Sequence, residues 1–168
     1  MSNSLHWRIW PIVLLFLVVC AARACAEFSN AQAEPSLAAH GMRAPAVPLV
    51  ACDPYFSIWS PADHLADADT THWTGKSHRL TSLVAIDKRI YRLMGRNPAN
   101  IAALEQTSVV ITPTQTKCTF AGGGVEITLT FTTPSLPGDI DLLSRPITYI
   151  AYSIRSRDGQ PHDTRIYF

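Results

Sequence analysis

The sequence predicts a mainly β protein: an antiparallel β-sandwich, incomplete at its C-terminus, that follows an N-terminal signal peptide. The clearest evidence is residues 125–131, where Val, Ile, Leu and Phe alternate with Glu and Thr. A period of two places one face of a strand in a core and the other in water. Short segments of this kind recur about every 8–12 residues between turn signals, which is typical of sandwiches.

The chain opens with the features of an exported protein. After a weakly basic start, residues 9–19 are almost wholly apolar, a run shorter than the ~20 residues that span a bilayer. Residues 24–26, Ala-Cys-Ala, form a small-residue cleavage pattern. We therefore expect a signal peptide over residues 1–26 and a secreted or periplasmic mature chain. An uncleaved anchor and a lipoprotein acylated at Cys20 are the alternatives.

The charge of the mature chain argues against partners that need a basic surface. Arg8 and Arg23 leave with the signal peptide, so 12 of the 14 basic residues remain against 13 acidic ones. A near-neutral chain without a basic stripe is not expected to bind nucleic acid. No long apolar run follows residue 26, so we expect no membrane contact after cleavage. We also expect no cofactor.

Residues 27–42 are rich in Ala, Ser, Gln and Asn without periodicity, which indicates a flexible linker. Cys52 and Cys118 are the cysteines of the mature chain. An oxidising compartment permits a disulfide between them. One pair does not make a disulfide scaffold, however, and we prefer two buried free thiols.

From residue 43 onward the pattern is that of strands. Residues 80–86 and 89–94 are the first two candidates. The Asp87-Lys88 pair between them predicts a tight turn, although the glycine that usually relaxes such a turn is missing.

Residues 97–106 are the one segment with a helical pattern, and Pro98 suits the first turn of a helix. Residues 107–112 predict another strand. Three glycines at 122–124 then predict a hairpin between residues 117–121 and residues 125–133.

Residues 148–156 alternate again, with Ile150, Tyr152 and Ile154 on one face, and Asp-Gly at 158–159 predicts the next turn. Residues 164–168 begin a last strand with no turn, cap or polar tail after it. Such a strand would be an unprotected edge or would lack its partner, which is a liability. We therefore expect the chain to be the N-terminal piece of a longer protein.

Residues 53–76 form the most unusual segment, with two Trp, two Pro, several acids and a Trp-Thr-Gly turn. The segment is too polar for a helix face and too irregular for a plain strand. It predicts a built loop, and binding residues concentrate on such loops. The candidates for an interface or a ligand contact are Trp59, Asp67, Asp69, His72, Trp73 and Lys76. Core and turn packing is the commoner role of such side chains.

Three carboxylates in this segment, Asp63, Asp67 and Asp69, are a weak candidate for a metal site. Several carboxylates in one loop supply the oxygen ligands that Ca²⁺ takes. Turn and cap roles are commoner for Asp, so our expectation is that no metal binds.

Three aromatic residues, Tyr55, Phe56 and Trp59, suggest a second alternative. Exposed rings of this kind would stack on sugars. The alternative function is therefore a non-catalytic carbohydrate- or surface-binding β-sandwich module.

Several sequence blocks occur in a fixed order that resembles one family. The blocks are RAPAVPL at 43–49, DPYFSIWS at 53–60, TTHWTGK at 70–76, LTSLV at 80–84, RLMG at 92–95, QTSV at 106–109, TLTF at 128–131 and LSRPITY at 143–149. Together they resemble the N-terminal region of the secreted glutaminase A family over nearly all of the mature chain.

The resemblance implies a role and a partner. In that family a β-sandwich region of unknown function precedes a helical toroid, where the active site is expected, and the full-length protein hydrolyses L-glutamine to L-glutamate and ammonia. The resemblance places no catalytic residue in this chain. It implies a non-catalytic accessory region, inactive by itself, whose partner is the missing helical toroid of the same protein. Residues 43–100 would be a glutaminase A-like segment and residues 101–168 a truncated β-sandwich.

Overall fold

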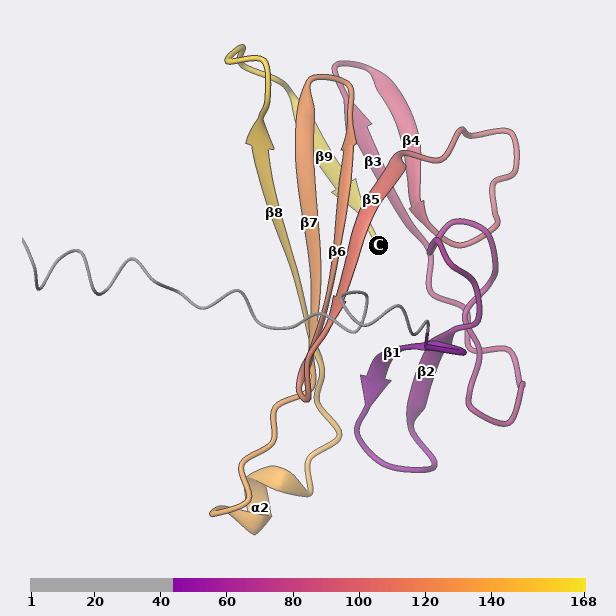
Figure 1. Cartoon of the computed structure of the whole chain (residues 1–168), viewed down its shortest axis with the longest axis vertical. Helices are drawn as coiled ribbons and strands as arrows, with labels where there is room; N and C mark the ends of the chain where they lie inside the picture. The colour runs from indigo at the N-terminus through magenta and orange to yellow at the C-terminus, as the bar shows by residue number, and fades with distance from the viewer. Residues whose placement is uncertain (1–43) are drawn as a thin grey trace, which may run out of the picture. The chain divides into compact units, whose positions relative to one another are not determined.

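The computed structural model describes residues 44–168, and nearly all of its regular elements are β-strands (Figure 1). The predicted signal peptide and linker, residues 1–26 and 27–42, lie outside the described residues. The strands form antiparallel sheets, which confirms the prediction of a mainly β chain with antiparallel pairing. Within residues 44–168, no helix is long and apolar enough to cross a membrane.

The described strands belong to three sheets. The two-stranded sheet pairs β1 (Val47–Ala51) with β2 (Ser57–Ser60). The three-stranded sheet has the order β4-β3-β9 and contains β3 (Ser82–Ile86), β4 (Arg89–Met94) and β9 (Thr164–Tyr167). The four-stranded sheet runs in sequence order through β5 (Glu105–Ile111), β6 (Gln115–Gly122), β7 (Val125–Thr132) and β8 (Tyr149–Ser156).

The predicted hairpin at the three glycines is confirmed. Gly122 of β6 pairs with Val125 of β7, so Gly123 and Gly124 are the two loop residues. Their φ angles are 59° and 81°, and two-residue hairpin loops with positive φ at both positions match the twist of the flanking strands. Glycine adopts this conformation at no steric cost.

The predicted turn between β3 and β4 is also confirmed, although it has no glycine. Asp87 and Lys88 have φ angles of 46° and 71°, a left-handed conformation that is costly for residues with a side chain. Asp87 is held there by Asp163: its N–H donates to the Asp163 carbonyl at 3.0 Å, and its carboxylate accepts from the Asp163 N–H at 3.0 Å. A contact far along the chain thus offsets the local strain.

The predicted helix over residues 97–106 is wrong. This segment forms a turn and then β5. Its backbone bonds to β4: the Arg92 N–H donates to the Ala102 carbonyl at 2.8 Å, and the Leu104 N–H donates to the Arg92 carbonyl at 2.8 Å. Leu104 is buried in the core. Pairing with a neighbouring strand and burial of Leu104 outweigh a weak helical preference.

The prediction of an irregular loop over residues 53–76 is wrong in part, because the segment contains β2. The sequence pattern also missed β1, its partner. The Trp59 N–H and carbonyl bond to Thr71 at 2.8 and 2.9 Å, so β2 has backbone partners on both sides. Tertiary pairing therefore makes a strand out of a sequence with weak local preference.

One core cluster draws on all three sheets. Its buried members are Val47, Leu49, Leu65, Val84, Ile86, Leu93, Met94, Leu104, Cys118, Phe120, Val125, Ile127, Leu129 and Phe131. The predicted alternation of residues 125–131 is confirmed, since every second side chain of β7 is buried. The predicted inward face of β8, with Ile150, Tyr152 and Ile154, also packs against this core, but these side chains are only partly buried.

Cys52 and Cys118 are both free thiols, as we preferred, but only Cys118 is buried. Cys118 is buried, and desolvation raises the pKa of its thiol to about 12, so this thiol stays protonated and unreactive at neutral pH. Cys52 is only half-buried, and its Sγ lies 3.5 Å from the Thr148 hydroxyl.

Candidate functional site

Two turns of the 53–76 segment, at residues 53–56 and 72–76, are joined at one carbonyl oxygen. The Pro54 carbonyl accepts from Trp73 Nε1 at 2.7 Å and from His72 Nε2 at 3.0 Å. Because a carbonyl can only accept, the His72 proton lies on Nε2, and Nδ1 accepts from the Thr74 N–H at 3.3 Å. The two turns are therefore held in a fixed arrangement.

Each of the two turns is also closed internally. The Asp53 carboxylate accepts from the N–H groups of Tyr55 and Phe56 at 2.7 and 2.9 Å, a usual Asp turn. The His72 N–H donates to the Lys76 carbonyl at 2.8 Å across Gly75, whose φ is 83°. Local hydrogen bonds of this kind build a rigid loop.

The joined turns present aromatic rings to the outside. Tyr55 is 92% exposed, Trp73 is 63% exposed and Phe56 is 39% exposed. We call Tyr55, Phe56 and Trp73 the aromatic surface. Since an ordered frame holds large apolar side chains in solvent, the arrangement suits contact with another surface or a flat ligand.

The predicted candidate residues do not all lie on this surface. Trp73 is exposed, and the His72 ring lies next to the Trp73 ring, with centroids 5.5 Å apart. Lys76 is exposed at the same turn. Trp59 instead is half-buried, and its Nε1 is buried without a hydrogen-bond partner. The three aromatic residues of the suggested sugar platform are therefore split, because Trp59 is half-buried whereas Tyr55 and Phe56 are exposed.

Asp63, Asp67 and Asp69, the weak candidate for a metal site, do not form one cluster of metal ligands. Asp69 lies 3.2 Å from Arg79 Nε and accepts from the Arg96 N–H at 3.1 Å, which are structural contacts. Asp67 is exposed, and the carbonyl of Asp63 accepts from Gln106 Nε2 at 3.1 Å. Among residues 44–168, no group of three or more His, Cys, Asp or Glu side chains is arranged to hold a metal ion.

The sequence analysis missed a histidine between two carboxylates. His162 Nδ1 lies 2.6 Å from Asp87 Oδ2, and its Nε2 lies 3.0 Å from Asp158 Oδ1. Hydrogen bonding to Asp87 and then Asp158 raises the pKa of His162. The pKa of Asp87 is lowered, first by its hydrogen bond to His162, and that of Asp158 is lowered to about 2, first by the Gln160 N–H. The turns at Asp87 and at Asp158 were both predicted, but the sequence gives no sign that His162 joins them.

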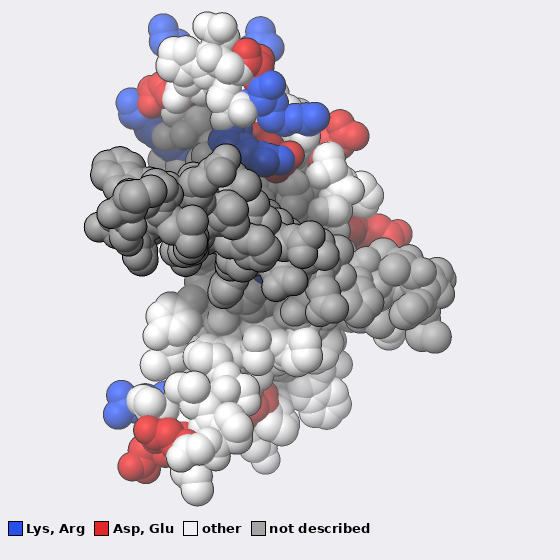
Figure 2. All heavy atoms as spheres, turned by 60° about the vertical axis from the view of Figure 1, so that its left-hand side comes forward, with Lys and Arg blue, Asp and Glu red and all other residues white. Residues whose placement is uncertain are grey.

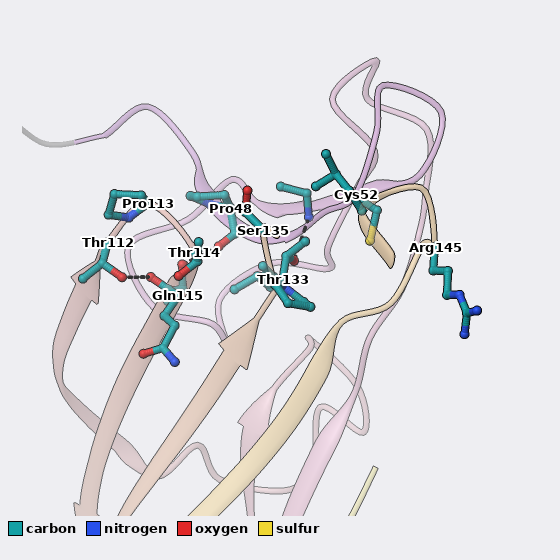
Figure 3. Close-up of a pocket in the computed structure, with 14 residues that line it drawn as sticks. Pro48, Cys52, Thr112, Pro113, Thr114, Gln115, Thr133, Ser135 and Arg145 are labelled. Carbon is teal, nitrogen blue, oxygen red and sulfur yellow. Dashed lines mark hydrogen bonds between the residues drawn. The ribbon is translucent and has the colours of Figure 1, made fainter. Parts of the chain in front are cut away.

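A cavity of about 270 Å³ lies at the other end of the strands, lined mainly by Thr, Pro and Ser residues (Figure 3). Thr112, Thr114 and Gln115 line it from the β5–β6 turn, and Thr133 lines it from the end of β7. The Thr112 hydroxyl donates to the Gln115 carbonyl at 3.2 Å, so this polar group of the lining is bonded within the lining itself. Figure 3 shows Arg145 pointing away from the cavity.

The charged side chains on the face in Figure 2 gather at the end that carries the β3–β4 and β8–β9 turns, and both signs are mixed there. The opposite end, with α2 (Ile140–Leu143), is largely white in this view, but it also shows a group of acidic atoms and some basic ones. Mixed charges of this kind create no strong field of one sign.

The sequence match places the chain in a family. Residues 16–106 match the model of a domain of unknown function, DUF4964, and the chain belongs to that family. Residues 114–168 match a second domain of unknown function, DUF5127. No solved structure matches the chain.

A curated relative gives these domains a context. The chain is 32% identical over 133 residues to Glutaminase A of Aspergillus oryzae, an alignment that covers 74% of this chain and 19% of the relative. The chain thus spans about a fifth of the length of the relative it matches. The resemblance to the N-terminal region of the glutaminase A family is confirmed.

Proposed function

We propose that the chain is the non-catalytic N-terminal accessory region of an exported glutaminase A-like amidohydrolase, whose helical toroid converts L-glutamine to L-glutamate and ammonia. The match to a fifth of Glutaminase A carries this proposal. On this view the mature chain is secreted or periplasmic and is inactive alone. Its partner is the helical toroid of the same protein.

The aromatic surface is the proposed contact with the catalytic part. Its frame is fixed by the bonds of Trp73 and His72 to the Pro54 carbonyl at 2.7 and 3.0 Å. A fixed frame loses little conformational freedom when it docks. Aromatic side chains in such positions are also the ones that dominate the energy of interfaces.

The proposed fold is a two-layer β-sandwich that is open on one side. Ser82 of β3 donates to the Tyr167 carbonyl of β9 at 3.2 Å, and its hydroxyl lies 2.9 Å from the Tyr152 hydroxyl of β8. The last strands of the two larger sheets, β8 and β9, therefore border the same side of the core.

A chimaera tests the accessory role. Residues 44–168 would replace the matching part of A. oryzae Glutaminase A, and release of ammonia from L-glutamine would be measured. We expect the chimaera to keep glutaminase activity and the separate chain to have none. A folded but inactive chimaera, or activity in the separate chain, would contradict the proposal.

The docking contact is tested in the same chimaera. Trp73→Ala should lower the melting temperature or the activity, whereas Tyr149→Ala should not, although the two side chains are 63% and 62% exposed. Equal effects of the two substitutions would contradict the docking contact at the aromatic surface. They would not contradict the accessory role.

A second candidate function is a carbohydrate- or surface-binding module, which the exposure of Tyr55 and Trp73 favours. In that case sugars, but not glutamine, would quench the tryptophan fluorescence of the chain, and Trp73→Ala would abolish the quenching. Quenching that survives this substitution would count against the aromatic surface as a sugar site.

A further inference from the structure

The strand β8 is an open edge of the four-stranded sheet. Among the described strands it pairs with β7 alone. The inward side chains of β7, such as Ile127 and Leu129, are fully buried, whereas Ile150 and Ile154 of β8 are only partly buried. The core is therefore left uncovered along β8, where one more strand would close it.

The other edges of the two larger sheets, β4, β5 and β9, carry features that discourage pairing. The edge of β4 is covered at Arg92, which bonds through its backbone to Ala102 and Leu104. The register of β5 shifts between Gln106 and Ser108, and β9 has four residues. By contrast, β8 has eight residues, no shift in register, and no Pro or Lys.

One hydrogen bond fixes the direction in which the backbone N–H and C=O groups of β8 point. The Arg157 N–H donates to the Gly124 carbonyl at 2.8 Å, in the same register as the β7–β8 pairs. Bonded and non-bonded pairs alternate along antiparallel strands, so Ala151, Ser153 and Arg155 turn their N–H and C=O groups toward β7. The groups of the residues between them, such as Tyr152 and Ile154, point outward.

The charges of β8 suit pairing with itself. Its one charged residue, Arg155, lies 2.6 Å from Glu126 of β7 in the same chain. In an antiparallel pair of two β8 strands centred on Ser153, Arg155 of each copy lies opposite Ala151 of the other. No like charges oppose one another, and like charges directly opposite would destabilise the pair.

We propose that the occupant of the β8 edge is a second copy of this chain. Two copies pair their β8 strands antiparallel about a two-fold axis, which joins two four-stranded sheets into one. The outward N–H and C=O groups of Tyr152 and Ile154 form the central bonds. The added strand covers the partly buried inward side chains.

Sedimentation of the purified chain over a range of concentrations tests the pairing. We expect a reversible dimer, and Ile154→Pro should weaken it at least about tenfold, or about 1.4 kcal/mol. Proline removes an outward N–H, and an edge strand tolerates that loss. In a two-fold dimer each copy carries the substitution, so two N–H groups are lost from the interface.

The control is Val109→Pro on the opposite edge of the same sheet. The Thr112 N–H donates to the Gln115 carbonyl at 2.8 Å, so by the same alternation the Val109 N–H points away from β6. Val109, like Ile154, is partly buried against the core. We expect this variant to dimerise like the unchanged chain. Equal weakening by both prolines would overturn the proposal.

A pair of charged variants tests the same edge without proline. Ser153 is exposed, so Ser153→Lys and Ser153→Glu should fold normally. Each should dimerise more weakly than the unchanged chain, because like charges meet at the centre, and an equimolar mixture should associate again. A chain that is monomeric at every concentration would also overturn the proposal and leave the edge to a strand of a longer protein.

Discussion

The imidazole Nδ1 of His162 lies 2.6 Å from a carboxylate oxygen of Asp87, which is 75 residues earlier in the chain. On its other side, Nε2 lies 3.0 Å from Asp158. The bonds join the β3–β4 turn to the connection between β8 and β9. Only a protonated imidazole can donate to both carboxylates, because the neutral ring has a single N–H.

This geometry predicts that His162 stabilises the fold in acid and less so in base. The pKa of His162 is raised above 6.5, so its contribution is complete below about pH 6.5 and is lost as the pH rises through the folded pKa. The lowered pKa values of Asp87 and Asp158 make their contributions complete above about pH 4 and lost below it. His162→Gln should therefore lower the melting temperature more at pH 5 than at pH 8.5.

Thermal unfolding of both proteins at the two pH values measures the effect. His64→Gln is the control, because His64 is exposed and lies in a different loop. The same loss of melting temperature at pH 5 and at pH 8.5 would show that His162 acts through packing and not through its charge.

A pair of glycines isolates the packing around His162. Gly124 and Gly159 both have positive φ, at 81° and 74°, so Ala should cost each about 1–2 kcal/mol of strain. A Cβ at Gly124 would also lie 2.5 Å from the Asp158 carboxylate and 2.6 Å from the His162 ring, whereas one at Gly159 meets no atom within 4 Å. Denaturant unfolding should show a larger loss for Gly124→Ala. Equal losses would contradict the close packing of the ring.

Arg92 ties three backbone segments together. Its guanidinium donates to the carbonyls of Ile101, Ala66 and Gly95 at 2.7, 2.9 and 2.6 Å. Arg92→Met should lower the free energy of unfolding by about 1–3 kcal/mol, because it leaves partly buried carbonyls without a donor.

The control for Arg92 is Arg79→Met, which removes an exposed ion pair with Asp69 at 3.2 Å. Pairs of that kind contribute about 0–1 kcal/mol. Urea unfolding of both variants distinguishes the two arginines, and a loss for Arg92→Met no greater than that for Arg79→Met would contradict the predicted role.

Phe131 tests the core. It is fully buried at the end of β7, so Phe131→Ala should cost about 3–5 kcal/mol of stability. Ile140→Ala should change stability by about 0.5 kcal/mol or less, because Ile140 in α2 is 77% exposed. Comparable losses in urea unfolding would mean that α2 packs on the core in solution.

The strands with strong alternation could be predicted from the sequence. In β7 every second side chain is apolar and buried, and the glycines at 123 and 124 fix its turn to β6. Such patterns depend only on neighbours in sequence, because side chains alternate across any strand. The hydrogen bond of the Trp73 side chain to Pro54 and the backbone pairing of Trp59 with Thr71 could not be predicted, because both join residues of different turns and strands.

By itself, the sequence determined the β class of the chain, the turns at Asp87 and Gly123, and the family, since these depend on local patterns and on blocks in order. The tertiary structure decided that residues 97–106 form a turn and the start of β5, with Ala102 and Leu104 bonded to β4, instead of a helix. It also decided that His162 joins two distant turns and that β8 pairs with β7 alone among the strands of residues 44–168. The physical reason is that these features depend on hydrogen bonds and burial between residues far apart in sequence, which override weak local preferences.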